Sequence, residues 1–170
     1  MHLVLGSERV DLRRGVVVIA TPETSAADRR HADLAWVRHG ADAPEAPFGG
    51  DAADAAGVRR LADAGAVVVG LADPTESALD AAGERGLAVL VPAVRRAAGR
   101  IPPERLLVTS DSPVDGAVAV LDLDATGPAA WGRATVALAA GVRVVRTSEP
   151  RSIRRVATVV ERLTTAVVRA

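Results

Sequence analysis

Two aspartates at the end of a predicted strand are the acidic pair best placed for chemistry. Asp122 and Asp124 follow the apolar run 118–121. In parallel sheets and barrels, the carboxyl ends of the strands line the ligand crevice. We therefore predict that this pair helps to bind a ligand.

Further candidate residues lie at two other strand ends. Asp111 follows the predicted strand 105–109 and could bind a cation, although acidic residues are also common where a helix starts. Ser148 precedes the last predicted helix, where backbone amides can hold a phosphate; the alternative is that it is an ordinary helix cap. Arg146 could reach an anion at the same place, or it could pair with Glu149 on the surface.

Missing residue types exclude several chemistries. The sequence contains no Cys, Lys, Tyr, Asn or Gln, which rules out disulfides, thiolate chemistry, Schiff-base lysines, tyrosine acids and carboxamide ligands. His31 and His39 are two turns apart on a predicted helix, too far to share one metal. Asp42 and Glu45 lie in a proline-broken segment that we interpret as a solvated loop. We assign no catalytic residue and expect neither a metal nor another cofactor.

The composition of the chain suits a single domain. Of its 170 residues 49% are hydrophobic and only 2% aromatic, so an aliphatic core is expected. The formal net charge is zero, which gives no sign of a nucleic-acid partner or an anionic membrane surface. No segment approaches the roughly 18 apolar residues that span a bilayer, and the first residues do not resemble a signal peptide. We expect a cytoplasmic protein with no nucleic-acid or membrane partner.

Short apolar runs alternate with helix-like segments along the chain, which is typical of parallel β/α units. Residues 2–12 predict a β-hairpin, and the segment 41–50 predicts a loop or a degenerate strand. The runs predict strands at 16–20, 66–72, 87–91, 105–109, 118–122 and 142–146. Helices are predicted at 25–39, 51–64, 73–85, 93–98, 128–140 and 150–168.

The expected fold is therefore α/β, with a shrunken or incomplete TIM-type (β/α) barrel of about six to seven parallel strands after an N-terminal β-hairpin. A complete barrel takes roughly 250 residues, and this chain is shorter. An open doubly wound sheet is the alternative.

Several segments resemble dihydropteroate synthases. The run Val18-Ile19-Ala20-Thr21-Pro22-Glu23-Thr24-Ser25 is similar to that family's Asn-Val-Thr-Pro-Asp-Ser-Phe-Ser loop, and 134–146 is similar to its last helix and Arg-Val-Val-Arg strand. Segments 62–69 and 101–107 are similar to its Ala-Gly-Ala-Asp-Ile-Ile-Asn-Asp and Ile-x-Pro-Glu-Arg-Ile motifs. The resemblance implies a pterin-binding barrel that joins a pterin pyrophosphate to p-aminobenzoate with magnesium. It also makes Thr21 a candidate ligand-binding residue.

The chain departs from the family pattern at positions that bind the metal and the substrate in the family. Ile19 stands where the family has a magnesium-binding Asn, and Gly70-Leu71 where it has a pterin-binding Asn-Asp. Asp122-Leu123-Asp124 occupies the neighbourhood of a Ser-Arg-Lys motif, and the closing Arg-x-His reads Arg146-Thr147-Ser148. Of these motif residues only Arg146 is kept, and one β/α unit, the third, is expected to be deleted.

These departures predict a catalytically degenerate dihydropteroate-synthase-like protein with a binding, accessory or scaffold role. The alternative is an enzyme with altered chemistry, acting on a small phosphorylated or pterin-like substrate at the strand mouth. In the family the last two helices form a dimer surface. Helices 128–140 and 150–168 are the best-preserved region here, so we predict a homodimer through them. A protein partner from a biosynthetic pathway is a further candidate.

Overall fold

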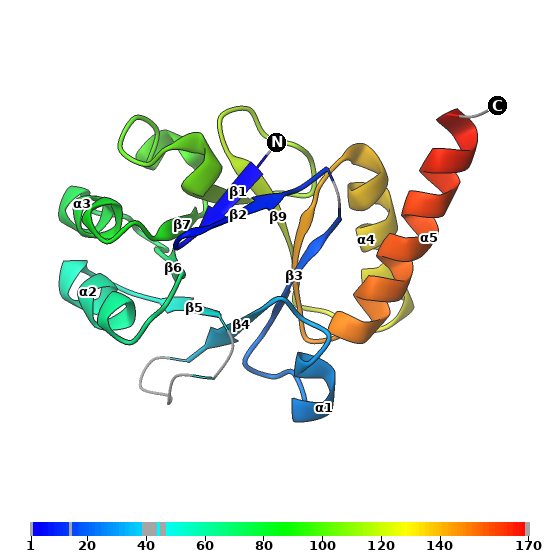
Figure 1. Ribbon diagram of the computed structural model, residues 1–170, viewed down its shortest axis with the longest axis horizontal. Coiled ribbons are helices and arrows are strands. Elements are labelled where there is room, and N and C mark those ends of the chain that lie inside the picture. The colour runs from blue at the N-terminus through cyan, green and yellow to red at the C-terminus, as the bar shows by residue number, and fades with distance from the viewer. Residues whose placement is uncertain (1, 14, 39–43, 45–46, 169–170) are drawn as a thin grey trace.

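Eight parallel strands close into a barrel in the computed structural model, which describes residues 2–13, 15–38, 44 and 47–168. The strand order around the barrel is β10-β3-β4-β5-β6-β7-β8-β9, so that the last strand pairs with the first (Figure 1). The strands are β3 (Val17–Ala20), β4 (Leu34–Val37), β5 (Phe48–Asp51), β6 (Val68–Gly70), β7 (Ala88–Val91), β8 (Leu106–Thr109), β9 (Val118–Leu123) and β10 (Val144–Thr147).

The predicted N-terminal hairpin is confirmed and lies across the amino end of the barrel. Strands β1 (His2–Leu5) and β2 (Glu8–Asp11) pair antiparallel, and Gly6 turns between them with a φ of 59° that glycine adopts without strain. Leu3 and Leu12 are fully buried among the aliphatic side chains of the barrel interior. The hairpin therefore seals this end of the barrel with apolar contacts.

The TIM-type barrel is confirmed, but it is closed and has eight strands rather than six to seven, because β4 lies where a helix was predicted and β5 is a full barrel strand. Strand β4 lies inside the predicted helix 25–39. The Ser25 hydroxyl does accept the backbone N–H of Asp28 and caps a helix, but that helix, α1 (Ala26–Arg29), has only one turn. Strand β5 begins inside the segment 41–50, which was predicted as a loop or a degenerate strand, and two of its four residues are glycines. Since β5 is the third barrel strand, the third unit has kept its strand.

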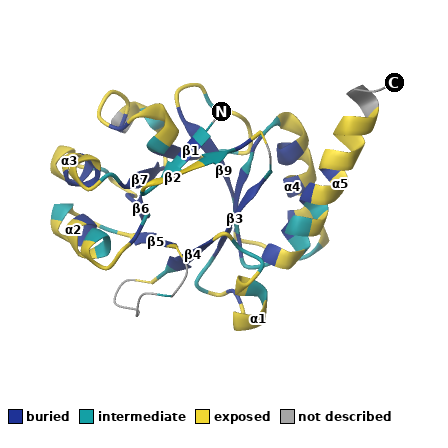
Figure 2. Ribbon diagram, in the orientation of Figure 1, coloured by how far each residue is buried: buried dark blue, intermediate teal, exposed yellow. Residues whose placement is uncertain are grey.

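The chain is short because its helix layer is thin. Helices α2 (Ala55–Asp63) and α3 (Glu76–Glu84) cover one part of the barrel, and α4 (Pro128–Ala140) and α5 (Pro150–Val168) cover another (Figure 1). Between β7 and β8 the predicted helix 93–98 is a 3₁₀ turn, η1 (Val94–Arg96), and a second turn, η2 (Pro103–Arg105), follows it. Figure 2 shows buried residues along the strands and on the inner faces of the helices.

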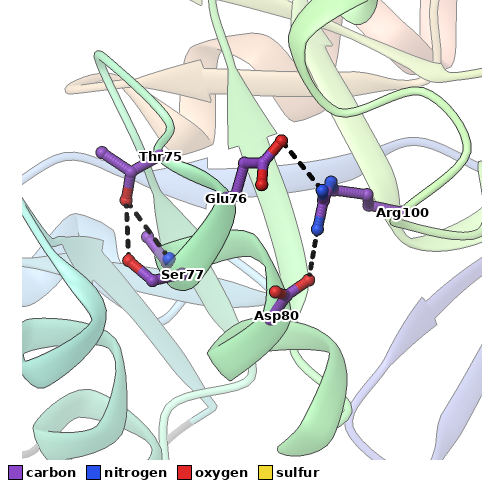
Figure 3. Close-up of polar contacts among 6 residues, drawn as sticks. Thr75, Glu76, Ser77, Asp80 and Arg100 are labelled. Carbon is purple, nitrogen blue, oxygen red and sulfur yellow. Dashed lines mark hydrogen bonds and ion pairs between the residues drawn. The ribbon is translucent and has the colours of Figure 1, made fainter.

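An arginine anchors this thin region to α3. Arg100 lies within 2.9 Å of a Glu76 carboxylate oxygen and within 2.7 Å of Asp80 Oδ1 (Figure 3). The same view shows Thr75, whose hydroxyl accepts the N–H of Ala78 and caps α3. These contacts hold the loop after β7 against α3 where a helix would otherwise pack.

The last two helices have the predicted bounds. Helix α4 ends at Gly141, which has a φ of 108°. In α5, Ile153 and Val160 are buried against the barrel, whereas Val159 and Leu163, predicted on the same face, are 56% and 60% exposed. Among the described residues, no helix has both the length and the apolar character needed to cross a membrane.

Candidate ligand-binding site at the barrel mouth

A pocket of about 680 Å³ opens at the carboxyl ends of the barrel strands. Its lining combines acidic and basic side chains with one aromatic ring. The lining residues are Thr21, Pro22, Glu23, Trp36, Arg38, Asp51, Thr109, Asp122, Leu123, Asp124, Arg133 and Arg146. This is the end of the barrel at which ligands bind in proteins of this architecture.

Strand register brings Arg146 and Asp122 together. The two residues are register partners on the neighbouring strands β10 and β9. The guanidinium of Arg146 donates from Nε to Asp122 Oδ1 at 3.0 Å and from Nη2 to Oδ2, which makes a bidentate pair. Both side chains are about three-quarters buried. The sequence left open a pairing of Arg146 with Glu149, but Asp122 is the partner.

Trp36 occupies the inner part of the mouth. Its side chain is 4% exposed and lies across two glycines, Gly49 and Gly70, on β5 and β6. A Cβ atom built on Gly49 would stand 2.9 Å from Cζ3 of the indole, and one on Gly70 would stand 2.8 Å from Cζ2. The indole Nε1–H donates to Asp51 Oδ2 at 3.1 Å. The ring therefore has a fitted cradle and a hydrogen-bond acceptor.

Arg146 also lies over this ring, with its Cζ atom 5.1 Å from the ring centroid, within the range of a cation–π contact. Burial disfavours the charged guanidinium. The hydrogen bond and negative charge of Asp122, with the charges of Asp51 and Asp124, nevertheless raise the pKa of Arg146 above its usual value. The inner mouth thus holds one cation among three carboxylates.

Two exposed ion pairs lie at the rim of the pocket. Arg38 Nη2 donates to Glu23 Oε1 at 2.8 Å, and this bond is the main cause that lowers the pKa of the Glu23 carboxyl. Arg133 Nη2 lies 3.1 Å from Asp111 Oδ1. The other two arginines of the lining are therefore also paired with carboxylates.

The structure places four of the six predicted ligand-binding residues in this lining. Thr21, Asp122, Asp124 and Arg146 line the pocket, while Asp111 binds the rim residue Arg133 from outside it. Ser148 is not a lining residue, and the hydroxyl of Thr147 accepts the N–H of Glu149 at the start of α5. The predicted phosphate position at this helix start thus lies beside the mouth.

A carboxylate of the chain itself lies at the amino end of α4. Glu149 Oε2 accepts the backbone N–H of Gly127 at 2.8 Å and the indole Nε1–H of Trp131 at 3.1 Å. The amino end of a helix favours an anion, and here Glu149 supplies it. The same contact joins the start of α5 to α4.

Sequence reasoning missed the role of five lining residues. Trp36 fell inside the predicted helix 25–39 and Asp51 at the start of the predicted helix 51–64, because β4 was not predicted and β5 only as a loop or a degenerate strand. No motif in the sequence marks Glu23, Arg38 and Arg133 as rim residues. His31 follows α1 in a turn rather than on a long helix. His39, Asp42 and Glu45 lie outside the described residues.

The described residues do not fit the magnesium ion that the resemblance implies. Ile19, at the position of the expected magnesium ligand, has no donor atom and is 1% exposed within the barrel. Magnesium requires oxygen ligands in a near-octahedral arrangement. Across the described parts of the chain, no group of three or more His, Asp or Glu side chains could hold a metal ion.

Of the comparisons with known proteins, the one with solved structures found similar folds. No protein-family model matches the chain, and no curated protein matches it. Among solved structures, the dihydropteroate synthase of Yersinia pestis is 16% identical with a TM-score of 0.72, covering 97% of this chain and 99% of that one. The 7,8-dihydropteroate synthase of Vibrio fischeri ES114 is 10% identical, with a TM-score of 0.73 and coverage of 97% and 98%.

The dihydropteroate synthase of Thermus thermophilus in complex with 4-aminobenzoate is 15% identical, with a TM-score of 0.71 and coverage of 96% and 100%. Identities this low establish similarity of fold and leave activity to be argued from the site. Together with the sequence motifs, these likenesses show that the chain has the fold of the dihydropteroate synthases.

Proposed function

We propose that this protein is a catalytically degenerate form of the dihydropteroate-synthase barrel with a non-enzymatic binding or accessory role. The observation that carries this proposal is the state of Arg146, the one residue kept from the compared motifs. Its guanidinium is bound bidentately by Asp122 and lies on Trp36. Asp122 takes two of the five N–H donors of the guanidinium and balances its positive charge, which weakens its attraction for an anionic substrate.

The charges at the mouth support the proposal. Departure of a pyrophosphate requires cationic groups or a metal where negative charge develops. Here Arg146 faces Asp51, Asp122 and Asp124, and each rim arginine is paired with an acid. An incoming pyrophosphate would be repelled by the carboxylates of Asp51 and Asp124, and Asp122 already balances the charge of the inner guanidinium.

The alternative of an enzyme acting on a phosphorylated substrate meets the same difficulty. Its proposed residues were Asp111, Asp122, Asp124 and Arg146. Asp111 lies outside the pocket, and Asp122 neutralises Arg146. These contacts favour the non-enzymatic proposal over altered chemistry on an anionic substrate.

The direct test is turnover. The purified protein is incubated with a pterin pyrophosphate, p-aminobenzoate and magnesium, and released pyrophosphate is measured. We expect no release above that of a matched sample without protein. Magnesium-dependent release that Arg146→Ala abolishes would overturn the proposal, because Arg146 would then act on the substrate.

We also propose that the protein forms a homodimer through α4 and α5. Val136 on α4 is 71% exposed, and Val159 and Leu163 on α5 are 56% and 60% exposed, although the opposite faces of both helices are buried (Figure 2). A second copy is the proposed occupant because Glu161 and Arg162, two exposed residues that directly precede Leu163 on α5, have opposite charges. A two-fold interface could set each of these charges against its opposite.

Light scattering after size-exclusion chromatography tests the dimer. We expect the mass of two chains for the wild type and of one chain for Leu163→Glu, with unchanged circular dichroism. Arg95→Glu, an exposed change elsewhere, serves as the control. A wild-type protein with the mass of one chain would contradict the homodimer.

A further inference from the structure

We infer that Trp36 is an internal ligand: its indole occupies a site built to hold a flat bicyclic aromatic ring that carries a ring N–H. This inference rests on the proposed function, because a working synthase mouth would have to leave this space open. Three features of the mouth support it, and each concerns groups that surround the ring rather than the ring alone.

The first feature is the cradle. Gly49 is the register partner of Trp36, and Gly70 is the register partner of Asp51. A side chain at either glycine would collide with the indole, because an added Cβ atom would lie 2.9 Å from the ring at Gly49 and 2.8 Å from it at Gly70. Two adjacent strands thus present bare backbone as a flat surface, on which an aromatic ring lies.

The second feature is polar recognition of the ring edge. Trp36 belongs to the apolar cluster of the barrel interior, and a buried indole N–H usually has an acceptor, which need not be charged. Here the N–H points to the carboxylate of Asp51, which comes from the top of β5 and lines the open pocket. A hydrogen bond to a charged group is stronger than a neutral one and selects ligands that can donate.

The third feature is the cation on the ring. The guanidinium of Arg146 lies over the indole, and Asp122 fixes its plane by two hydrogen bonds. The ring thus contacts the two glycines and the guanidinium, while Asp51 accepts its N–H. The Trp36 indole therefore makes the contacts that a bound aromatic ligand would make.

Removal of the indole should leave a site for free indole. Trp36→Gly empties the cradle and keeps Asp51 and Arg146 in place. Calorimetry with this variant is expected to show saturable binding of indole and, since one hydrogen bond to the carboxylate is lost, about tenfold weaker binding of 1-methylindole. In the Trp36→Gly protein, a second change, Asp51→Ala, should remove most of this preference for indole.

Trp131→Gly is a matched control. The Trp131 indole also donates to a carboxylate at 3.1 Å, that of Glu149, but it is 36% exposed at the start of α4 and has no glycine cradle. This variant should bind no indole. Wild-type protein should not bind indole either, because Trp36 fills the site.

If Trp36→Gly does not fold alone, Trp36→Leu tests the same inference, since leucine keeps an apolar contact with the glycines and frees the space beside Asp51. For either variant, indole should raise the melting temperature more than 1-methylindole does. Equal effects of both compounds, or no effect in either variant, would overturn the inference. These results do not depend on turnover by the wild type, so the inference and the proposed function can fail separately.

Discussion

The amino end of the barrel is closed by aliphatic side chains, and the carboxyl end by a tryptophan and charged groups. At the first, Leu3 and Leu12 of the hairpin complete an apolar core. At the second, Trp36, which belongs to the same apolar cluster, contacts Asp51 and Arg146, and Asp122 binds Arg146. Apolar closure is sufficient for stability, and burying charges adds a desolvation cost. The polar closure therefore marks the end of the barrel where function is to be sought.

The largest expected effect is at the apolar end. Leu12→Ala should lower the free energy of unfolding by about 3 kcal/mol, because it removes a fully buried side chain and leaves a cavity. Urea denaturation measures this loss. In a Trp131→Phe background, the fluorescence of Trp36 should stay unchanged. A changed Trp36 spectrum would show that the two ends are not independent.

The glycine cradle should be intolerant of a methyl group. Gly70→Ala is expected to lower the free energy of unfolding by about 1–3 kcal/mol, because its Cβ would overpack against the Asp51 carboxylate and Trp36. Gly83→Ala on α3 is the matched control: no atom lies within 4 Å of its added Cβ, so it should raise stability by about 0.5–1 kcal/mol. Equal effects of the two changes in urea denaturation would contradict the cradle.

The Arg146–Asp122 pair should act as a unit. Arg146→Met leaves the partly buried Asp122 carboxylate without its partner, and should lower the free energy of unfolding by about 1–2 kcal/mol. Asp122→Leu should have a similar effect. The double variant should lose about 1 kcal/mol less free energy of unfolding than the sum of the two single losses. Additive losses would mean that the pair is not coupled.

The smallest effect is expected at the exposed rim. Arg38 lowers the pKa of Glu23 from its ordinary value of 4.5, so this pair stabilises the fold above that pH and the contribution is lost as pH falls through the lowered pKa. Arg38→Ala should return the pKa of Glu23 toward 4.5, as measured by NMR titration of the carboxyl carbon. Arg133→Ala, at the other rim pair, should leave the Glu23 pKa where it is in the wild type.

Much of the fold could be predicted from local signals. Long amphipathic segments with clear ends, such as α4 and α5, match the structure at both ends, and the apolar runs after residue 66 coincide with strands. The failures are β4 and β5. Leu34–Val37 follows a capped helix of only one turn, which the sequence suggested was longer. Two of the four residues of Phe48–Asp51 are glycines, which are uncommon in strands. Both are strands because their neighbours pair with them, which no local pattern reveals.

The site could be predicted only where it lies on recognised strands. Asp122 and Arg146 were found because β9 and β10 were recognised, although their pairing depends on register between strands. Trp36 and Asp51 were missed with β4 and β5. Gly70 was interpreted as a lost pterin ligand, whereas its bare backbone is what admits the indole.

Calorimetric titration of the wild-type protein with a pterin pyrophosphate, with and without magnesium, tests the central claim most directly. The account predicts no binding under either condition, because Trp36 fills the inner mouth and Asp122 neutralises Arg146. Micromolar binding would contradict it, since a pterin site would then have survived the loss of its family residues and the presence of the indole.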